Sequence, residues 1–104
     1  GLTVSDFPLE RPSGLAQAVR ETTLEFGPLT LHKKLLPLPA GVRVVLVLES
    51  AEPLTDLTLT DPLPGGGEQV FQFALFQGRQ TLTYDLDSPR APQLTDPQVR
   101  WRYP

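Results

Sequence analysis

The segment from Asp61 to Glu68 reads Asp-Pro-Leu-Pro-Gly-Gly-Gly-Glu, a composition that could form a ligand-binding loop. Glycine-rich loops bind phosphate when a lysine and a hydroxyl residue follow the last glycine and open a helix. Here Glu68 follows the glycines, and its carboxylate would repel phosphate. The same residues also fit a turn, in which an acid bonds the backbone, prolines stop strand pairing and glycines adopt positive φ angles. We therefore predict a structural turn formed by Asp61, Pro62, Pro64, Gly65, Gly66 and Gly67.

Several aspartates stand at the ends of predicted strands, where carboxylate oxygens could bind calcium. Asp85 and Asp87 are the best candidates, because residues two apart share one face of a strand. The chain lacks the D-x-D-x-D-G spacing of a calcium loop, however. We therefore expect solvated turn acids and no metal for the set Asp56, Asp61, Asp85, Asp87 and Asp96.

His32 is the only histidine, and the chain has no cysteine, which argues against a zinc site and excludes thiol chemistry. No G-x-S-x-G elbow or comparable signal of an activated hydroxyl is present. We expect His32 on the protein surface, and we predict neither catalysis nor a cofactor.

Lys33 and Lys34 raise the possibility of an amide bond between a lysine and a carboxyl side chain, as some surface-protein sandwiches contain. That chemistry needs a neutral buried lysine, an Asn or Asp acceptor and a nearby acid. The chain has no Asn, so only Asp can accept. Adjacent residues of a strand point to opposite faces, so only one of the two lysines can point inward. We do not predict this bond from the sequence.

The segment Arg100 to Tyr103 alternates cations with aromatic rings. Alternation along a strand places Trp101 and Tyr103 on one face and Arg100 and Arg102 on the other. We expect Trp101 in the core with Tyr103 at its edge. An exposed Trp101–Tyr103 pair that binds carbohydrate remains the alternative, and all four residues are then interaction candidates.

The composition of the 104 residues fits one folded domain. A net charge of -3 argues against nucleic acid, and no apolar run is long enough for a transmembrane segment. The chain has 12 prolines and no Cys, Met, Asn or Ile, which favours a heat-adapted or harshly exposed protein and also fits a GC-rich genome. Gly1 in place of Met suggests a processed chain or an excised segment.

Hydrophobic periodicity predicts an all-β protein. Polar and apolar residues alternate in most segments, whereas Gly41 to Ser50 is apolar on both faces and should be a central strand. Turns are expected at Glu52-Pro53 and at Gly78. Seven or eight short strands with a turn about every ten residues predict an antiparallel two-sheet sandwich. The predicted strands are residues 20–26, 29–35, 41–50, 56–61, 69–76, 80–87 and 98–104, with Phe71, Phe73 and Leu75 facing inward.

The first 28 residues stand apart from residues 29–104, which should form the sandwich core of the single domain. A short N-terminal strand is expected within residues 1–28. At most one short helix is predicted, over Pro12 to Glu21, since Ser13 could cap it.

Three stretches carry a family resemblance: "LHKKLLPLPAGVRVVLVLES", "LTDLTLTDPLPGG" and "GRQTLTYDL". Together they resemble the Ig-like conserved repeat domains of bacterial and archaeal surface and envelope proteins. The D-P-L-P-G element is also similar to sandwich domains of bacterial alpha-2-macroglobulin-like proteins. Ser50-Ala51-Glu52 replaces the Asn that is usual in one turn of the repeat family. The resemblance implies an Ig-like sandwich and carries over no catalytic residue.

What the resemblance implies is a non-catalytic structural or interaction module on a cell surface, in an envelope or in an extracellular assembly. Its partners would be other protein chains, copies of itself or a surface polysaccharide. One specific version is polymerisation, in which residues 1–10 add as a strand to the next molecule; folding back as the domain's own first strand is the expected alternative.

Overall fold

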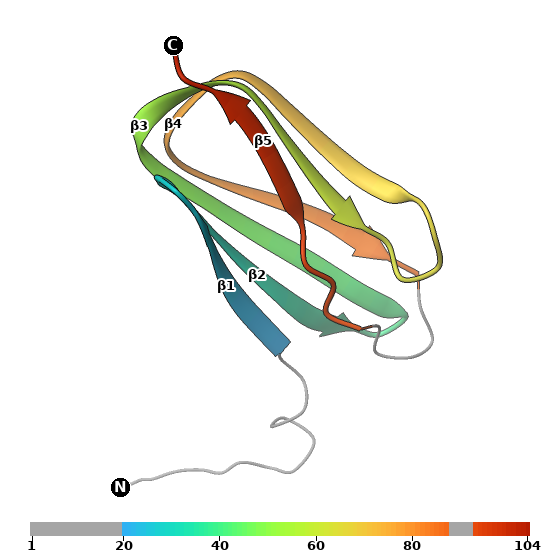
Figure 1. Ribbon diagram of the computed structural model, residues 1–104. Helices are drawn as coiled ribbons and strands as arrows, with labels where there is room; N and C mark the ends of the chain where they lie inside the picture. The colour runs from blue at the N-terminus through green and yellow to red at the C-terminus, as the bar shows by residue number, and fades with distance from the viewer. Residues whose placement is uncertain (1–19, 88–92) are drawn as a thin grey trace, which may run out of the picture.

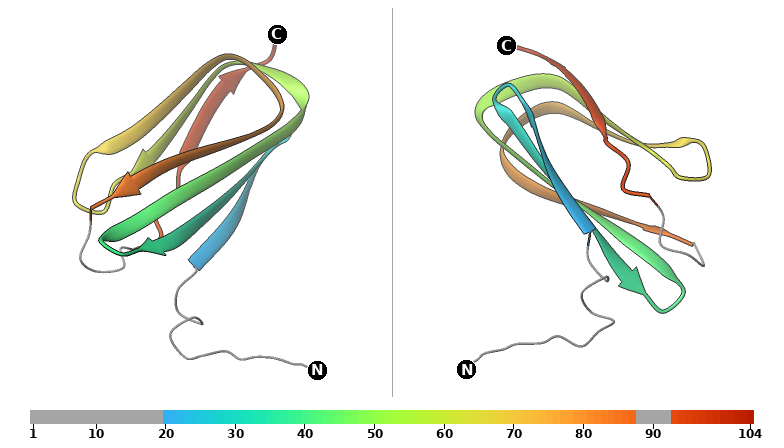
Figure 2. Two further views of the ribbon diagram at one scale, coloured as in Figure 1. Left: turned by 180° about the vertical axis from the view of Figure 1, so that it is seen from behind. Right: turned by 60° about the horizontal axis from the view of Figure 1, so that its bottom comes forward.

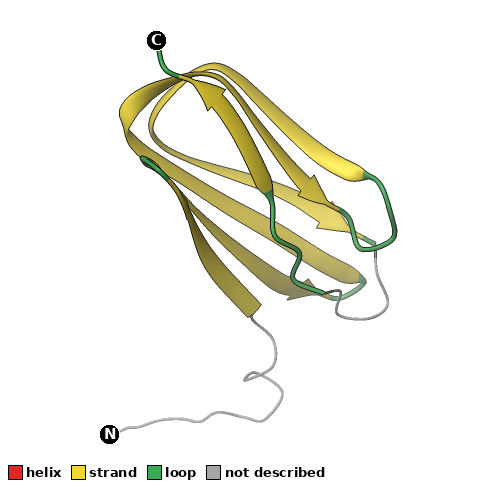
Figure 3. Cartoon of the chain, in the orientation of Figure 1, coloured by secondary structure: helices red, strands yellow, loops and turns green. Residues whose placement is uncertain are grey.

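The computed structural model of the chain describes residues 20–87 and 93–104, and all regular structure in them is β-strand (Figure 3). The five strands belong to one antiparallel sheet (Figure 1). Among these residues there is no helix, and therefore none long and apolar enough to cross a membrane. The strands are β1 (Arg20–Phe26), β2 (Leu29–Leu38), β3 (Gly41–Pro62), β4 (Glu68–Leu86) and β5 (Gln98–Arg102).

The strand order of the sheet is β1-β2-β3-β4, and β5 pairs with β3. The first half of β3 lies between β2 and the second half of β4. The second half of β3 lies between β5 and the first half of β4. Strand β3 is therefore the central strand throughout, as its first half, with valines on both faces, predicts.

Strands β3 and β4 bend together near their middle, where their register shifts between Ser50 and Leu54. The Ser50 hydroxyl donates a hydrogen bond to the carbonyl of Glu52 at 2.8 Å, and the Gln77 side-chain amide donates to the carbonyl of Ala51 at 2.9 Å. Gly78, which pairs with Ser50, has a φ of 94°. Beyond the bend the sheet folds back over itself, so that it forms two facing layers (Figures 1 and 2).

The core lies between these layers and is made almost entirely of leucine and valine. Alternate residues of β2 and β3 supply it, as the period of two predicts. Half-buried aromatic and aliphatic side chains from β4 and β5 pack against it. The buried apolar residues are Leu29, Leu31, Leu35, Val42, Val44, Leu46, Leu48, Leu54, Leu57, Leu59 and Phe76.

The described strands differ from the predicted ones in number. The antiparallel all-β prediction is confirmed, but there are five strands in one sheet instead of seven or eight in two. The reason is that Glu52-Pro53 and Gly78 lie in bends inside continuous strands and do not reverse the chain. Each of the two long strands therefore contains two of the predicted ones.

The expected inward orientation of Leu75 is wrong, because this side chain is 63% exposed and Phe76 is buried instead. The cause lies opposite on β3, where Asp56 has a φ of 50°. Leu54 and Leu57 are both buried, so the alternation reverses between them. The paired residues of β4 follow the same reversal.

The predicted helix lies outside the described residues except at its end, where Arg20 and Glu21 belong to β1. The short N-terminal strand expected within residues 1–28 lies outside the described residues, whereas the separately predicted strand 20–26 is β1 and pairs with β2. The segment proposed to exchange, residues 1–10, lies outside the described residues.

Candidate functional site

The functional candidate with the most unusual chemistry is a lysine and an aspartate buried in the core. Lys33 lies on β2, on the same face as Leu31 and Leu35, and is 2% exposed. Asp61 lies next to the last residue of β3 and is fully buried. Lys33 Nζ and Asp61 Oδ1 are 2.7 Å apart. The two residues come from opposite layers, so their contact joins the layers far from the bend.

Two further side chains complete this cluster, which we call the buried polar network: Lys33, Asp61, Tyr84 and Thr95. Lys33 Nζ also donates to the carbonyl and the hydroxyl of Thr95, at 2.7 and 2.8 Å. The Thr95 hydroxyl donates to the carbonyl of Pro62 at 2.8 Å and lies 3.2 Å from Asp61 Oδ1. The Tyr84 hydroxyl donates to Asp61 Oδ2 at 2.5 Å. Both oxygens of the aspartate and the lysine nitrogen are thus hydrogen-bonded.

The electrostatics of the network follow from its burial. Removing a charged lysine and a charged aspartate from water costs several kcal/mol for each ion, roughly, unless close partners compensate. Burial and the hydrogen bond to Asp61 raise the pKa of Tyr84 above its ordinary value, so the hydroxyl keeps its proton. The expectation that Asp61 is a solvated turn acid is therefore wrong, because this carboxyl is a core residue with three polar neighbours.

The glycine-rich segment next to Asp61 connects β3 to β4. The amide of Leu63 donates to the carbonyl of Gly67 at 3.0 Å, and the amide of Gly66 donates to the carbonyl of Leu63 at 3.1 Å. Gly66 and Gly67 have φ angles of 105° and 83°. Pro62 was predicted to stop strand pairing, but it still pairs with Glu68 in the sheet, so the turn begins after it. The turn thereby holds Asp61 at the end of its strand.

Trp101 on β5 is half-buried and packs against the core. Its six-membered ring lies over the turn between β1 and β2, since a Cβ atom built on Gly27 would be 3.6 Å from it. Tyr103 is 62% exposed, and its ring stands at 86° to that of Trp101. Nearly perpendicular rings do not form the continuous flat surface on which a sugar ring stacks.

The arginines of the last strand, Arg100 and Arg102, are both exposed, as alternation predicts. Arg102 forms a salt bridge with Asp56, the residue with the positive φ on β3. The Thr55 hydroxyl donates to the carbonyl of Arg102 at 2.8 Å. These contacts attach β5 to β3.

The candidate calcium ligands Asp85 and Asp87 are exposed at the end of β4 and beyond it. Asp85 accepts hydrogen bonds from Arg43 at 2.8 and 3.2 Å, and these bonds lower the pKa of its carboxyl. Within residues 20–87 and 93–104, no three His, Cys, Asp or Glu side chains are grouped as a metal site would require.

His32 is partly exposed on the outer face of β2, opposite to Lys33. Its Nε2 lies 2.9 Å from Glu21 Oε1, and its Nδ1 lies 2.7 Å from the Thr23 hydroxyl. Both partners are on β1, so the ring spans the β1–β2 pair. This arrangement orients the ring on the surface of the β1–β2 pair and sets the exposed Thr23 hydroxyl beside it.

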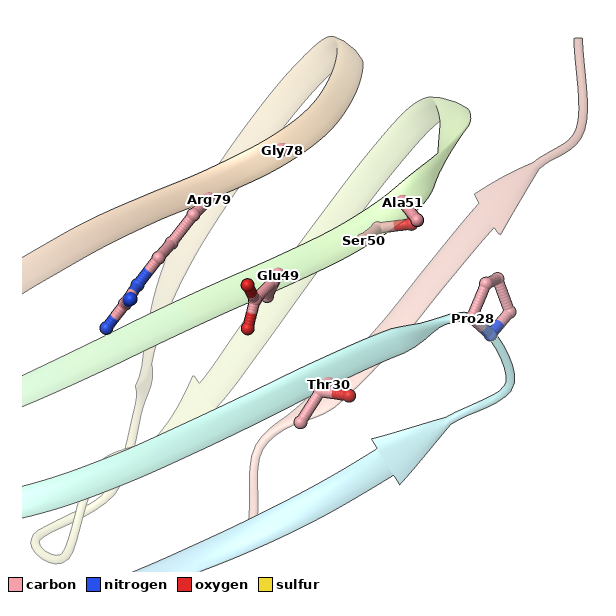
Figure 4. A pocket seen from close by; sticks show the side chains of 7 residues that line it. All are labelled: Pro28, Thr30, Glu49, Ser50, Ala51, Gly78 and Arg79. Carbon is pink, nitrogen blue, oxygen red and sulfur yellow. The ribbon is translucent and has the colours of Figure 1, made fainter.

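An open depression of about 410 Å³ lies at the bend, lined by Pro28, Thr30, Glu49, Ser50, Ala51, Gly78 and Arg79 (Figure 4). The side chains of Thr30 and Glu49 lie along two neighbouring strands there, and Arg79 extends away along a third. No buried charged group points into the depression. Its polar lining residues Thr30, Glu49 and Arg79 are neighbours across three strands on the outer face of the sheet, so the depression is open and unlike the enclosed cleft that is typical of a small-molecule site.

Sequence reasoning found one half of the buried network and missed the other. Strand alternation requires that one of the two adjacent lysines points inward, and that residue is Lys33. Tyr84 packs against the core from β4, as the alternation along residues 80–87 predicts. No sequence pattern pointed to Thr95, and Asp61 was predicted to be exposed to solvent because it stands beside a turn.

Comparison of the chain with known proteins found no protein family whose model matches it, no similar curated protein and no similar solved structure.

Proposed function

We propose that this protein is a non-catalytic structural or interaction module of a cell surface, an envelope or an extracellular assembly. The observation that carries the proposal is the buried polar network. Its ionisable groups face one another between the two layers instead of lining a cleft, and each is hydrogen-bonded within the network. Groups arranged in this way hold a fold together and are closed to a substrate.

The finer fold that we propose is an Ig-like sandwich. The bends in β3 and β4 divide the sheet into a layer of β1, β2 and two half-strands, and a layer of β5 and two half-strands. Counted by layer, these are the seven strand segments that the periodicity predicts. The Asp-Pro-Leu-Pro-Gly element that resembles the surface repeat domains forms the turn beside the network.

Interaction through strand edges fits this architecture. Within the described ranges, β1, β4 and β5 each pair with only one neighbour. Strand β4 is 19 residues long and carries Leu75 and Val70, which are 63% and 45% exposed. A long edge strand with exposed apolar side chains is a template for pairing with another chain.

Exchange of the N-terminal segment is the version of this proposal that makes polymers. Residues 1–10 alternate like a strand, and the open edges described above could accept them from a neighbouring molecule. Multi-angle light scattering on the full chain should then show oligomers whose size grows with concentration. Val4→Pro removes an amide that a donated strand needs and should shift the chain to monomer. A monomer at every concentration in the unsubstituted chain would contradict exchange.

The surface assignment is tested in the cells that make the protein. An antibody against the folded chain should label intact cells, and the chain should be found with the envelope or in the medium. A cytosolic enzyme followed in the same fractions is the control for lysis. The composition supports this location, since a chain without Cys, Met or Asn has few side chains that oxidise or deamidate. Recovery of the chain in the cytosolic fraction alone would overturn the assignment.

A further inference from the structure

The buried polar network combines an amine, a carboxyl group and a hydrogen-bond donor in a site that excludes water. We propose that Lys33 and Asp61 condense within the folded chain and form an amide (isopeptide) bond between β2 and the end of β3. The bond would be a modification of the protein by its own residues, and it is independent of where the protein is located.

The first requirement is proximity. Lys33 Nζ lies 2.7 Å from Asp61 Oδ1, and the side chains are 2% and 0% exposed. Packing of the two layers holds both groups in place, and such orientation raises the effective concentration of one reactant at the other by many orders of magnitude. Exclusion of water also slows the reverse reaction, hydrolysis of the amide.

The second requirement is a neutral amine and a neutral acid. Low-dielectric surroundings disfavour charged groups relative to neutral ones. Transfer of one proton along the Lys33–Asp61 hydrogen bond converts the ion pair to an amine and a carboxylic acid with no net change of charge. The carbonyl and the hydroxyl of Thr95 keep the nitrogen beside the carboxyl group during this transfer.

The third requirement is stabilisation of the negative charge that develops on the carboxyl oxygen when nitrogen attacks. Tyr84 donates its hydroxyl to Asp61 Oδ2, the oxygen that does not contact Lys33. Because burial raises the pKa of Tyr84, the hydroxyl stays protonated and remains a donor. Tyr84 is therefore the residue that we assign to oxyanion stabilisation, and its protonated hydroxyl takes the place of the nearby acid that this chemistry ordinarily uses.

The reaction balances without a further reactant. The lone pair of the neutral Lys33 nitrogen forms a bond to Asp61 Cγ, and charge moves to Oδ2. The nitrogen then loses a proton to the departing hydroxyl group on Oδ1, and the C–O bond breaks. One amide bond and one water molecule are formed, and nothing is oxidised or reduced.

The test is the intact mass of the full chain under denaturing conditions. The expected mass is lower than the sequence mass by one water molecule, and digestion should give a branched peptide that joins Lys33 to Asp61. Loss of water through a backbone succinimide is not open to Asp61, because the next residue, Pro62, has no N–H. A chain of full sequence mass would overturn the proposal.

Three single variants assign the bond. Lys33→Met and Asp61→Ala should each have the full mass calculated from their sequences. Lys34→Met is the matched control, because Lys34 is the adjacent residue on the outer face of β2, and it should still lose one water. A Lys33→Met chain that still lost water would assign the loss to another site and overturn the proposal. The mass is read on unfolded chains, so a variant that folds poorly still gives a result.

Acid cleavage provides a second readout inside one molecule. Asp-Pro bonds break in dilute acid when the aspartate carboxyl is free, and the chain has two of them, Asp61-Pro62 and Asp96-Pro97. In the denatured chain only Asp96-Pro97 should break, because the Asp61 carboxyl is part of the amide. Equal cleavage at both sites would contradict the bond.

The role of Tyr84 is tested by rate. Tyr84→Phe keeps the ring and removes the donor, so when chains made unfolded by chemical synthesis are folded for the first time, the variant should lose water at least tenfold more slowly than the unsubstituted chain. Circular dichroism at each time point shows that the variant is folded. An unchanged rate would remove the oxyanion role from Tyr84 and would contradict that part of the proposal.

Discussion

Lys33 and Lys34 are adjacent in the chain but occupy opposite surroundings, because successive side chains of a strand point to opposite faces. Lys33 lies in the core beside Asp61, and Lys34 lies on the outer face of β2. One position of the strand thus determines whether an amine is hydrated or is held against a carboxyl group. The environment of each lysine amine in this protein therefore depends on whether strand alternation places its side chain in the core or on the outer face.

Tyr84 should make the stability of the protein fall in alkaline solution. Its pKa is raised in the folded chain above its ordinary value of about 10. Above about pH 10 the unfolded chain loses the phenolic proton while the folded chain keeps it, so the unfolded state becomes more stable relative to the folded state. The free energy of unfolding should therefore be fully retained below about pH 10 and fall above it, and because solvent partly screens the half-buried hydroxyl, the fall should stay well under the limit of about 1.4 kcal/mol per pH unit.

Tyr84→Phe separates this effect from other titrations at high pH. The variant should lose about 1–2 kcal/mol of stability at neutral pH, since a buried acceptor loses its donor. Its stability should then decline less steeply between pH 9 and 11 (roughly the range in which tyrosine titrates) than that of the unsubstituted chain. Guanidinium chloride unfolding at each pH measures both. Parallel profiles of the free energy of unfolding against pH in the two proteins would contradict the assignment of the alkaline loss of stability to Tyr84.

At the scale of elements, the hairpins and bends fix which strands meet. Strand β2 ends near Leu38, and the chain enters β3 at Gly41, close to the end of β4. A Cβ atom built on Gly41 would lie 2.1 Å from the carbonyl oxygen of Leu86. Only glycine permits this approach of two backbones, so the β2–β3 hairpin can align with the end of β4.

Gly41→Ala should consequently destabilise the protein by about 1–3 kcal/mol, because the backbone of β3 or β4 has to move. Gly65→Ala in the turn between β3 and β4 is the matched control, since nothing lies within 4 Å of its built Cβ. That control should change the stability by less than about 1 kcal/mol. Thermal unfolding followed by circular dichroism compares them. Equal effects of the two substitutions would show that the contact with Leu86 does not limit position 41.

The sequence predicts the elements well wherever the information is local. Strand β1 has the predicted bounds, and the apolar alternation of β2 and β3 identifies most of the core. Prediction from the sequence fails where the geometry depends on distant residues. The left-handed backbone of Asp56 reverses the alternation near Leu75, and the alternating pattern of the sequence does not predict this conformation. The partner of Lys33 is 28 residues away, so a local pattern could predict that the lysine is buried but not what it contacts.

At the scale of the whole molecule, the two layers are held together at both ends by different means. At one end β3 and β4 run continuously through the bend from one layer into the other. Toward the other end the layers meet at the buried polar network. Residues 87–97 already lead from β4 in one layer to β5 in the other at this end, and an amide bond there would add a direct cross-link between the layers through the core. Such a molecule would resist separation of its layers, which suits a protein that bears load or is exposed outside the cell.

Replacement of both members of the pair distinguishes a covalent link from an ion pair. A double substitution of a buried ion pair by apolar residues is often neutral or stabilising, because the cost of burying two charges disappears. Loss of a covalent link between residues 28 positions apart should instead cost about 3.5 kcal/mol, the loop entropy that the link removes from the unfolded chain. We expect Lys33→Met with Asp61→Leu to be less stable than the unsubstituted chain by about this amount in guanidinium chloride unfolding. Lys34→Met controls for the loss of a lysine. A double variant as stable as the unsubstituted chain would mean that Lys33 and Asp61 form an ion pair without a covalent link.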